Sequence, residues 1–286
     1  MKTPLPSVIL SFLLLPLVIA RKVLKQPHIV LIVADDLGYN DVPWHNPTII
    51  SPHLQDLAKA GVILEQNYVQ PKCAPSRAAL MTGRYPFHTG RQHESLPPQM
   101  PTGLSTKYRL LPQRLQEVGY KTHAVDKWHL GCCDWDYTPT RRGFETFFGF
   151  YTHGADYYER LAGDSEGGFK GYDLRSNESV THEGEGEYSA HLFSRKAAEV
   201  IQNHERKNPM FLYLAFQSIH KPIQVPDQYS RRYQPYGKLS KDSKRKGMIT
   251  ALDEAVKNVT IALKQKKMYQ DTVIIFISDN GGTEMD

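Results

Sequence analysis

Four apolar runs in the chain have the pattern of buried β-strands, and each of them ends in polar residues. Continuous stretches of Val, Ile and Leu are typical of strands that are covered on both faces, as in a parallel sheet. The run at 28–36, HIVLIVADD, leads directly into two aspartates. The other three runs lie at 121–129, 210–220 and 272–280.

Segments with helical periodicity lie between these runs. The first one begins with a Ser-Pro pair and stops at Gly61, as helices commonly do. Strands that alternate with helices predict an α/β fold with a parallel sheet covered on both sides. The segments in which apolar residues recur every three to four positions are 51–61, 110–120, 187–204 and 251–267.

Two stretches do not fit the alternation of strands and helices. Residues 150–187 are rich in Gly, Tyr and charge, and we predict a long loop insertion there. Residues 238–247 carry a cluster of basic side chains, which we interpret as a solvated loop. The formal net charge of +5 is compatible with an anionic substrate but does not indicate one, and we expect no nucleic-acid partner.

Side chains suited to catalysis or binding follow all four predicted strands. In open α/β sheets, ligands bind beyond the carboxyl ends of the strands. A single Asp at such a position usually caps the next helix, and a single His is usually an ordinary loop residue. Four strands that all end in this way are harder to explain, so we predict a site formed by Asp35, Asp36, Lys127, His129, His220, Asp279 and Asn280.

The acidic part of this set has the composition of a metal site. Asp35, Asp36, Asp279 and Asn280 offer only oxygen ligands. Carboxylates held close together repel each other unless a cation lies between them. Oxygen ligands suit Ca²⁺ or Mg²⁺, whereas zinc and copper favour nitrogen or sulfur.

The first 20 residues have the pattern of a secretory signal peptide. Lys2 precedes an apolar run from Val8 to Ala20, which is shorter than the roughly 20 residues that a membrane span needs. We expect residues 21–286 to form the mature domain, without a membrane span, in the lysosome or outside the cell. Two sequons for N-glycosylation begin at Asn177 and Asn258, and entry into the secretory pathway would make their modification more credible.

The segment CAPSR, which begins at Cys73, allows three interpretations. A thiolate phosphatase needs an arginine six positions after its cysteine, but Ala79 stands there. A disulfide is the usual role of a cysteine in a secreted protein, although the chain has only three cysteines. The third interpretation is a cysteine that is not used as a thiol.

Several motifs of the chain resemble the sulfatase family. CAPSRAALMTGR (73–84) matches the sulfatase signature, and VADDLGY, DKWHLG, SIHKP and SDNGG match further family segments in the expected order. PTRRGFETFFGF (139–150) is most similar to the arylsulfatase B branch. The resemblance implies an alkaline-phosphatase-like fold with a mixed, mostly parallel sheet between helices. It also implies hydrolysis of sulfuric esters, with N-acetylgalactosamine 4-sulfate groups of glycosaminoglycans or small aryl sulfates as substrates.

The resemblance also assigns roles to the predicted residues. It implies that a formylglycine-generating enzyme oxidises Cys73 to formylglycine, whose hydrate attacks sulfur and later expels sulfate. It implies that Asp35, Asp36, Asp279 and Asn280, together with an oxygen of modified Cys73, bind Ca²⁺. Arg77 and His129 would contact the hydrate, Lys127 would bind sulfate, and His220 would bind sulfate and protonate the leaving oxygen.

The chain departs from the family pattern in three ways. Asp126 replaces the usual glycine before Lys127, so its carboxylate could pair with that lysine or point away. Cys132 and Cys133 are adjacent, whereas the family has cysteines elsewhere. The resemblance also implies a C-terminal subdomain beyond Asn280, which we expect to be absent here. We therefore expect apolar surface to be exposed on strand 272–280, and poor folding or low activity.

Two other functions are compatible with the same residues. A metal phosphodiesterase of the same superfamily would use Ser or Thr as nucleophile and two zinc ions, which Cys73 argues against. A secreted protein that binds sulfated sugars without hydrolysing them is favoured by Asp126 and by the short C-terminal end. Turnover and metal content separate these alternatives.

Overall fold

The structure is a computed structural model, and it describes residues 26–93, 96–98, 100–163, 168 and 170–282. The predicted signal peptide at 1–20 lies outside the described residues. Within those residues, no helix has the length and apolar character that crossing a membrane requires.

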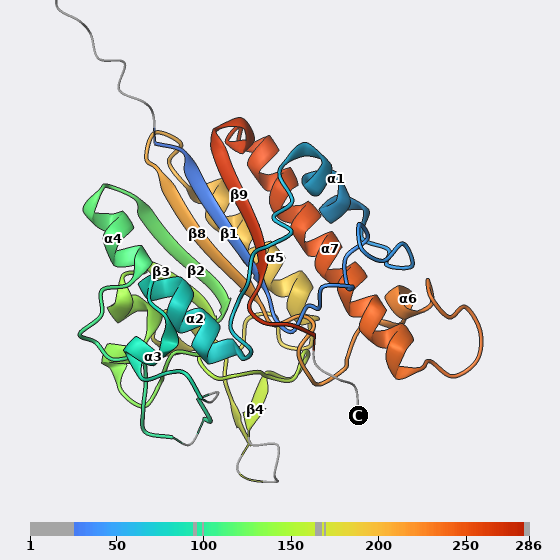
Figure 1. Ribbon diagram of the computed structural model, residues 1–286, viewed down its shortest axis with the longest axis horizontal. Helices are drawn as coiled ribbons and strands as arrows, with labels where there is room; N and C mark the ends of the chain where they lie inside the picture. Colours follow the sequence, from blue (N-terminus) through green and yellow to red (C-terminus); the bar gives the residue numbers. More distant parts are fainter. Residues whose placement is uncertain (1–25, 94–95, 99, 164–167, 169, 283–286) are drawn as a thin grey trace, which may run out of the picture.

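A seven-stranded sheet forms the centre of the molecule (Figure 1). Its strands stand in the order β7-β6-β3-β2-β8-β1-β9, so β1 lies next to strands from far along the chain. These strands span His28–Ala34 (β1), Lys121–Lys127 (β2), Thr146–Phe150 (β3), Arg175–Ser176 (β6), Ser179–Val180 (β7), Met210–Phe216 (β8) and Thr272–Ser278 (β9).

The four apolar runs of the sequence all form strands of this sheet. The central strand β1 pairs in parallel with β8 and β9, and β2 pairs in parallel with β3 and β8. The short strands β6 and β7 add to β3 in antiparallel fashion. The predicted α/β fold with a mostly parallel sheet is therefore confirmed, and the carboxyl ends of the main strands meet at one edge.

Helices cover both faces of the sheet, and alternate residues of β1 show how. Val30 and Ile32 are buried in a core with residues of α5 and α7, whereas Leu31 and Val33 pack with residues of α2 on the other face. The period of two follows from the pleat of a strand. The helices span Pro52–Ala60 (α1), Cys73–Thr82 (α2), Pro86–Thr89 (α3), Leu111–Glu117 (α4), Ser189–Asn203 (α5), Asp227–Ser230 (α6) and Lys241–Gln265 (α7).

Two predictions about loops need correction. Helix α7 begins at Lys241, so most of the basic stretch 238–247 is helical. The Oγ of Ser240 accepts a hydrogen bond of 3.1 Å from the backbone N–H of Ser243, which caps the helix ten residues before its apolar periodicity becomes clear. The stretch 150–187 is not one loop either, because it contains β6, β7 and a small separate sheet of β4 (Leu161–Gly163) and β5 (Lys170–Tyr172).

Among the described residues, strand β9 is the last strand on its side of the sheet and pairs with β1 alone. Val273 is 46% exposed and Ile275 is 42% exposed, whereas every residue of β8 is buried. The predicted exposure of apolar surface on this strand is therefore confirmed.

Candidate active site

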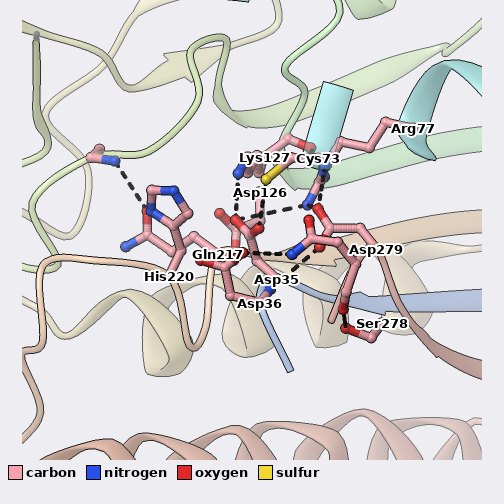
Figure 2. Close-up of polar contacts among 12 residues, drawn as sticks. Asp35, Asp36, Cys73, Arg77, Asp126, Lys127, Gln217, His220, Ser278 and Asp279 are labelled. Carbon is pink, nitrogen blue, oxygen red and sulfur yellow. Dashed lines mark hydrogen bonds and ion pairs between the residues drawn. The ribbon is translucent and has the colours of Figure 1, made fainter. Parts of the chain in front are cut away.

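The carboxyl ends of β1, β2, β8 and β9 bring most of the predicted residues together (Figure 2). One ligand atom from each of Asp35, Asp36, Cys73 and Asp279 lies within 4.8 Å of the others. His220 forms a second such group with Asp35 and Cys73. Parallel strands place residues from distant parts of the chain at one edge, which is the geometry that the sequence predicts.

Cys73 is the first residue of α2, so it lies at the amino terminus of a helix, where anions are favoured. Its Sγ donates a hydrogen bond of 3.3 Å to Oδ1 of Asp35. Burial, and then the negative charge of Asp35, raise the pKa of the Cys73 thiol well above its usual range. The thiol therefore remains protonated at neutral pH, and this site does not activate Cys73 as a thiolate nucleophile.

The pKa values of Asp35 and Asp279 are shifted in opposite directions. Burial, and then the charge of Asp279, raise the pKa of Asp35 to about 8. Burial alone would raise the pKa of Asp279, but the charges of Arg77 and Lys127 and the hydrogen bonds to the carboxylate together outweigh burial, so this pKa is lowered. Asp279 thus stays ionised, while Asp35 needs a further positive charge nearby to ionise fully at neutral pH.

Two buried cations compensate part of this negative charge. Nε and Nη2 of Arg77 donate hydrogen bonds of 3.0 and 2.8 Å to one oxygen of Asp279. Lys127 forms an ion pair with Asp35. Three acids, namely Asp35, Asp36 and Asp279, therefore face two bases in the described part of the cluster.

The remaining donors fit a hard cation. Nδ2 of Asn280 donates a hydrogen bond of 2.7 Å to Asp36, whereas its Oδ1 is buried and has no hydrogen-bond partner among the described residues. A buried oxygen without a partner is costly unless something binds it. Together with the excess of carboxylates, it gives an oxygen-rich set that suits Ca²⁺ or Mg²⁺.

The two histidines of the site are neutral, and backbone carbonyls determine their tautomers. Nδ1 of His220 lies 2.7 Å from the carbonyl oxygen of Lys221, so Nδ1 carries the proton and Nε2 is an acceptor. Burial lowers the pKa of His220 to about 3. Nε2 of His129 donates to the carbonyl oxygen of Leu96 at 3.2 Å, and burial lowers its pKa well below the usual range.

The backbone at His129 is in the left-handed conformation. Its φ is +56°, and strand β2 already ends at Lys127. Lys127 and His129 therefore do not lie on one face of an extended segment, as residues two positions apart in a strand would. The chain turns between them, and the backbone N–H of His129 bonds to the carbonyl oxygen of Tyr151 at 3.1 Å.

Asp126, which stands where the family has glycine, points away from Lys127. Its Oδ2 accepts a hydrogen bond of 3.0 Å from the backbone N–H of Gln217, and Lys127 pairs with Asp35 instead. Asp126 is completely buried, and burial raises its pKa well above the usual range. Its carboxyl group therefore supports the start of the loop that carries His220, and it does not compete for Lys127.

Two residues near the site were not found from the sequence. Tyr213 accepts a hydrogen bond of 3.3 Å at its hydroxyl from Nη1 of Arg77. The ring of His153 lies 6.1 Å from that of His129 and 6.0 Å from that of His220, measured between centroids. Tyr213 could have been noticed in the sequence, because its hydroxyl is a polar group inside the apolar run 210–220. His153 follows β3, whose short sequence TFFGF gave no clear strand pattern.

Comparison with known proteins identifies the family. A family model for sulfatases matches residues 27–284. The chain belongs to the sulfatase family. It is 43% identical over 259 residues to arylsulfatase J of Mus musculus, which covers 90% of this chain and 43% of that protein. It is 32% identical over 292 residues to arylsulfatase A of Homo sapiens, which covers 96% of this chain and 55% of that protein.

A comparison with solved structures shows which fold the chain has. The crystal structure of Ps i-CgsB in complex with k-i-k-neocarrahexaose superimposes with a TM-score of 0.81 and 34% identity, over 91% of this chain and 59% of the other. The predicted alkaline-phosphatase-like fold is therefore confirmed. The chain spans about half the length of these curated relatives. The matches establish the family, and the arylsulfatase B branch remains a prediction.

Proposed function

We propose that this chain is the catalytic domain of a calcium-dependent sulfatase that uses Cys73, oxidised to formylglycine, to hydrolyse sulfuric esters. The expected substrates are 4-sulfated N-acetylgalactosamine units of glycosaminoglycans, as in the arylsulfatase B branch, or small aryl sulfates. Residues 21–286 would form this domain after removal of the signal peptide. The lysosome or the extracellular space would be its destination.

The observation that carries this proposal is the environment of Cys73. Its Sγ lies in a group of four ligand atoms within 4.8 Å, next to Asp35, yet burial and charge raise the pKa of the thiol. A thiolate is therefore disfavoured at the position where the nucleophile is needed. An oxygen nucleophile made from Cys73 by a formylglycine-generating enzyme removes this difficulty, because it does not depend on thiol ionisation.

The oxygen-rich cluster supports the calcium part of the proposal. Asp35, Asp36, Asp279 and the Oδ1 of Asn280 would hold the ion, together with an oxygen of modified Cys73. When bound, calcium stabilises negative charge on the nucleophile and on the sulfate group. A positive charge at this position also keeps Asp35 ionised despite its burial.

The chain's own cations and histidines supply the rest of the chemistry. Lys127 presents its ammonium group beside Asp35 and Cys73, where it would attract a sulfate oxygen. Nδ1 of His220 donates to the carbonyl oxygen of Lys221, which fixes the ring with Nε2 toward Cys73. Nε2 carries no proton in this tautomer, so His220 would first have to take one up, which a bound sulfate anion would favour, before it could protonate the leaving oxygen. Arg77 holds Asp279 and thereby orients the acidic cluster.

The decisive experiment combines mass spectrometry with a turnover assay. The chain would be produced in secretory cells with and without extra formylglycine-generating enzyme, and the peptide containing Cys73 would be weighed. We expect oxidised Cys73 and hydrolysis of an aryl sulfate that rise together and require calcium. An unmodified thiol with full turnover would contradict the proposed nucleophile. Binding of sulfated sugars without any turnover would favour the non-catalytic alternative, and two bound zinc ions would favour the phosphodiesterase.

A further inference from the structure

We propose that Asn177 carries an N-linked glycan whose innermost sugars lie in a groove at the amino-terminal edge of the main sheet. This groove, called here the amino-edge groove, is at the end of the sheet opposite to Cys73. The proposal is therefore independent of the sulfatase activity.

Asn177 lies at the tip of the hairpin formed by β6 and β7, in the two-residue loop between the paired residues Ser176 and Ser179. Its φ is +54°, a left-handed conformation that asparagine tolerates better than most residues. The side chain is exposed, and so is Ser179, the hydroxyl residue of the sequon. The folded chain therefore leaves room for a modification that is added before folding.

Strand β3 and its continuation hold three of the four polar atoms of Asn177. Its backbone N–H donates to the carbonyl oxygen of Phe147 at 2.7 Å, and its Oδ1 accepts from the backbone N–H of Phe147 at 2.9 Å. The hydroxyl of Tyr151 donates to its carbonyl oxygen at 2.9 Å. The fourth atom, Nδ2, has no acceptor among the described residues. Nδ2 is the atom that carries an N-linked sugar, and none of the three hydrogen bonds uses it.

The other sequon provides a contrast. Asn258 lies in the middle of α7, and its Nδ2 donates to Oγ of Ser194 on α5 at 3.4 Å. The next two residues, Val259 and Thr260, are buried in the packing of this helix. A sugar on Asn258 would replace one of the two hydrogens of an Nδ2 that contacts α5, whereas Nδ2 of Asn177 makes no such contact among the described residues. The structure thus favours Asn177 as a site that tolerates a glycan without local change.

The amino-edge groove begins at Asn177 itself and has a volume of about 610 Å³. This volume lies within the range of roughly 300 to 1,000 Å³ that is usual for small-molecule sites. Apolar side chains, including Phe147 and Val200, form part of its wall. Amide and charged side chains that can bond to sugar hydroxyl and N-acetyl groups line the remainder, and they include Lys121, Glu145, Lys196, Asn203 and Asn208.

The position of the hairpin gives the glycan a second effect. Strand β7 is the last strand on its side of the sheet, and its residues Ser179 and Val180 are exposed. Exposed edges of sheets can pair with other chains and cause aggregation. A glycan that is attached two residues before this strand covers the edge, so its loss is expected to increase association between chains.

The test uses the chain with Asn258→Gln, expressed in secretory cells, so that only Asn177 can be modified. Peptide N-glycosidase in heavy-oxygen water converts a glycosylated asparagine into labelled aspartate, which mass spectrometry locates. We expect label at Asn177. We also expect release of the glycan from the native protein to be at least tenfold slower than from the denatured protein, because the innermost sugars are enclosed by the groove.

Two variants serve as matched controls. Ser179→Ala abolishes the glycan but leaves Asn177 and the groove intact, so it should abolish the label and increase aggregation on concentration. Asn203→Ala removes a groove side chain and should make release from the native protein faster. Unmodified Asn177 in the total pool of expressed chain would overturn the proposal. Equal release from native and denatured protein would overturn the placement in the groove. Neither result depends on turnover, so failure here is distinct from failure of the proposed sulfatase activity.

Discussion

Charged side chains are buried at one end of the central sheet and exposed at the other. At the carboxyl end, Asp35, Arg77 and Lys127 are completely or almost completely removed from solvent and interact with each other. At the amino end, the amino-edge groove is lined by exposed pairs such as Lys121 with Glu145.

The cost of burying charge explains why the cluster around Cys73 is the better candidate for catalysis. An exposed ion pair contributes about 0–1 kcal/mol and requires no special arrangement. A buried charge costs several kcal/mol unless partners compensate it, so the buried charged groups around Cys73 are held in place by the whole fold. Buried charges of this kind interact strongly with an ion that enters the cluster. Water in the groove screens the charges there.

The largest difference between the two ends is expected in turnover. Cys73→Ala removes the residue from which the nucleophile is made, and aryl sulfate hydrolysis should fall by about 10⁴-fold or more. Asn203→Ala in the amino-edge groove should leave turnover within about twofold. Steady-state assays with equal amounts of folded protein measure both. Comparable losses in the two variants would remove the functional distinction between the ends.

The second difference is expected in stability. Arg77→Met leaves Asp279 buried without its main partner, and the free energy of unfolding should decrease by about 3–5 kcal/mol in a calcium-free buffer. Lys121→Met removes the exposed ion pair with Glu145 in the groove and should change the free energy of unfolding by less than about 1 kcal/mol. Urea denaturation followed by circular dichroism gives both values. A small effect of Arg77→Met would mean that water reaches the cluster.

Calcium should stabilise only the carboxyl end. An ion bound by Asp35, Asp36 and Asp279 at 100 times its dissociation constant contributes about 2.7 kcal/mol of folding free energy. A chelator should therefore lower the melting temperature by several degrees, and calcium should restore it. The Asp36→Asn variant should respond less, whereas a Glu145→Gln variant of the groove should respond as the wild type does. An unchanged melting temperature would contradict the metal site.

The smallest effect is expected at the amino end, as a dependence on pH. Burial, and then His204, lower the pKa of His123 to about 4 in the folded protein, whereas the ordinary value is near 6.5. The fold therefore favours neutral His123. The stabilisation is fully present above pH 6.5 and is lost as the pH falls toward 4, by up to about 1.4 kcal/mol per pH unit. His123→Gln should weaken this acid dependence, and denaturation curves at pH 7.5 and 5.5 compare the two proteins.

Much of the fold and part of the candidate site could be predicted from the sequence. The apolar runs marked four strands because burial on both faces leaves a continuous pattern, and Cys73 stood in a motif with many fixed positions. Short elements such as β6 and β7 were missed, since two residues carry no periodicity. The amino terminus of α7 was missed because its basic first turns resemble a solvated loop, and only the cap at Ser240 marks the start.

The sequence by itself determined the types of side chain available: carboxylates after two strands, a cysteine in a modification motif, and histidines and a lysine beyond the others. Tertiary structure decided which of them interact. It directed Arg77 to Asp279, paired Lys127 with Asp35 rather than with its neighbour Asp126, and set the tautomer of His220 through a backbone carbonyl. These choices depend on distances between segments up to 202 positions apart, and no local pattern in the chain records such distances.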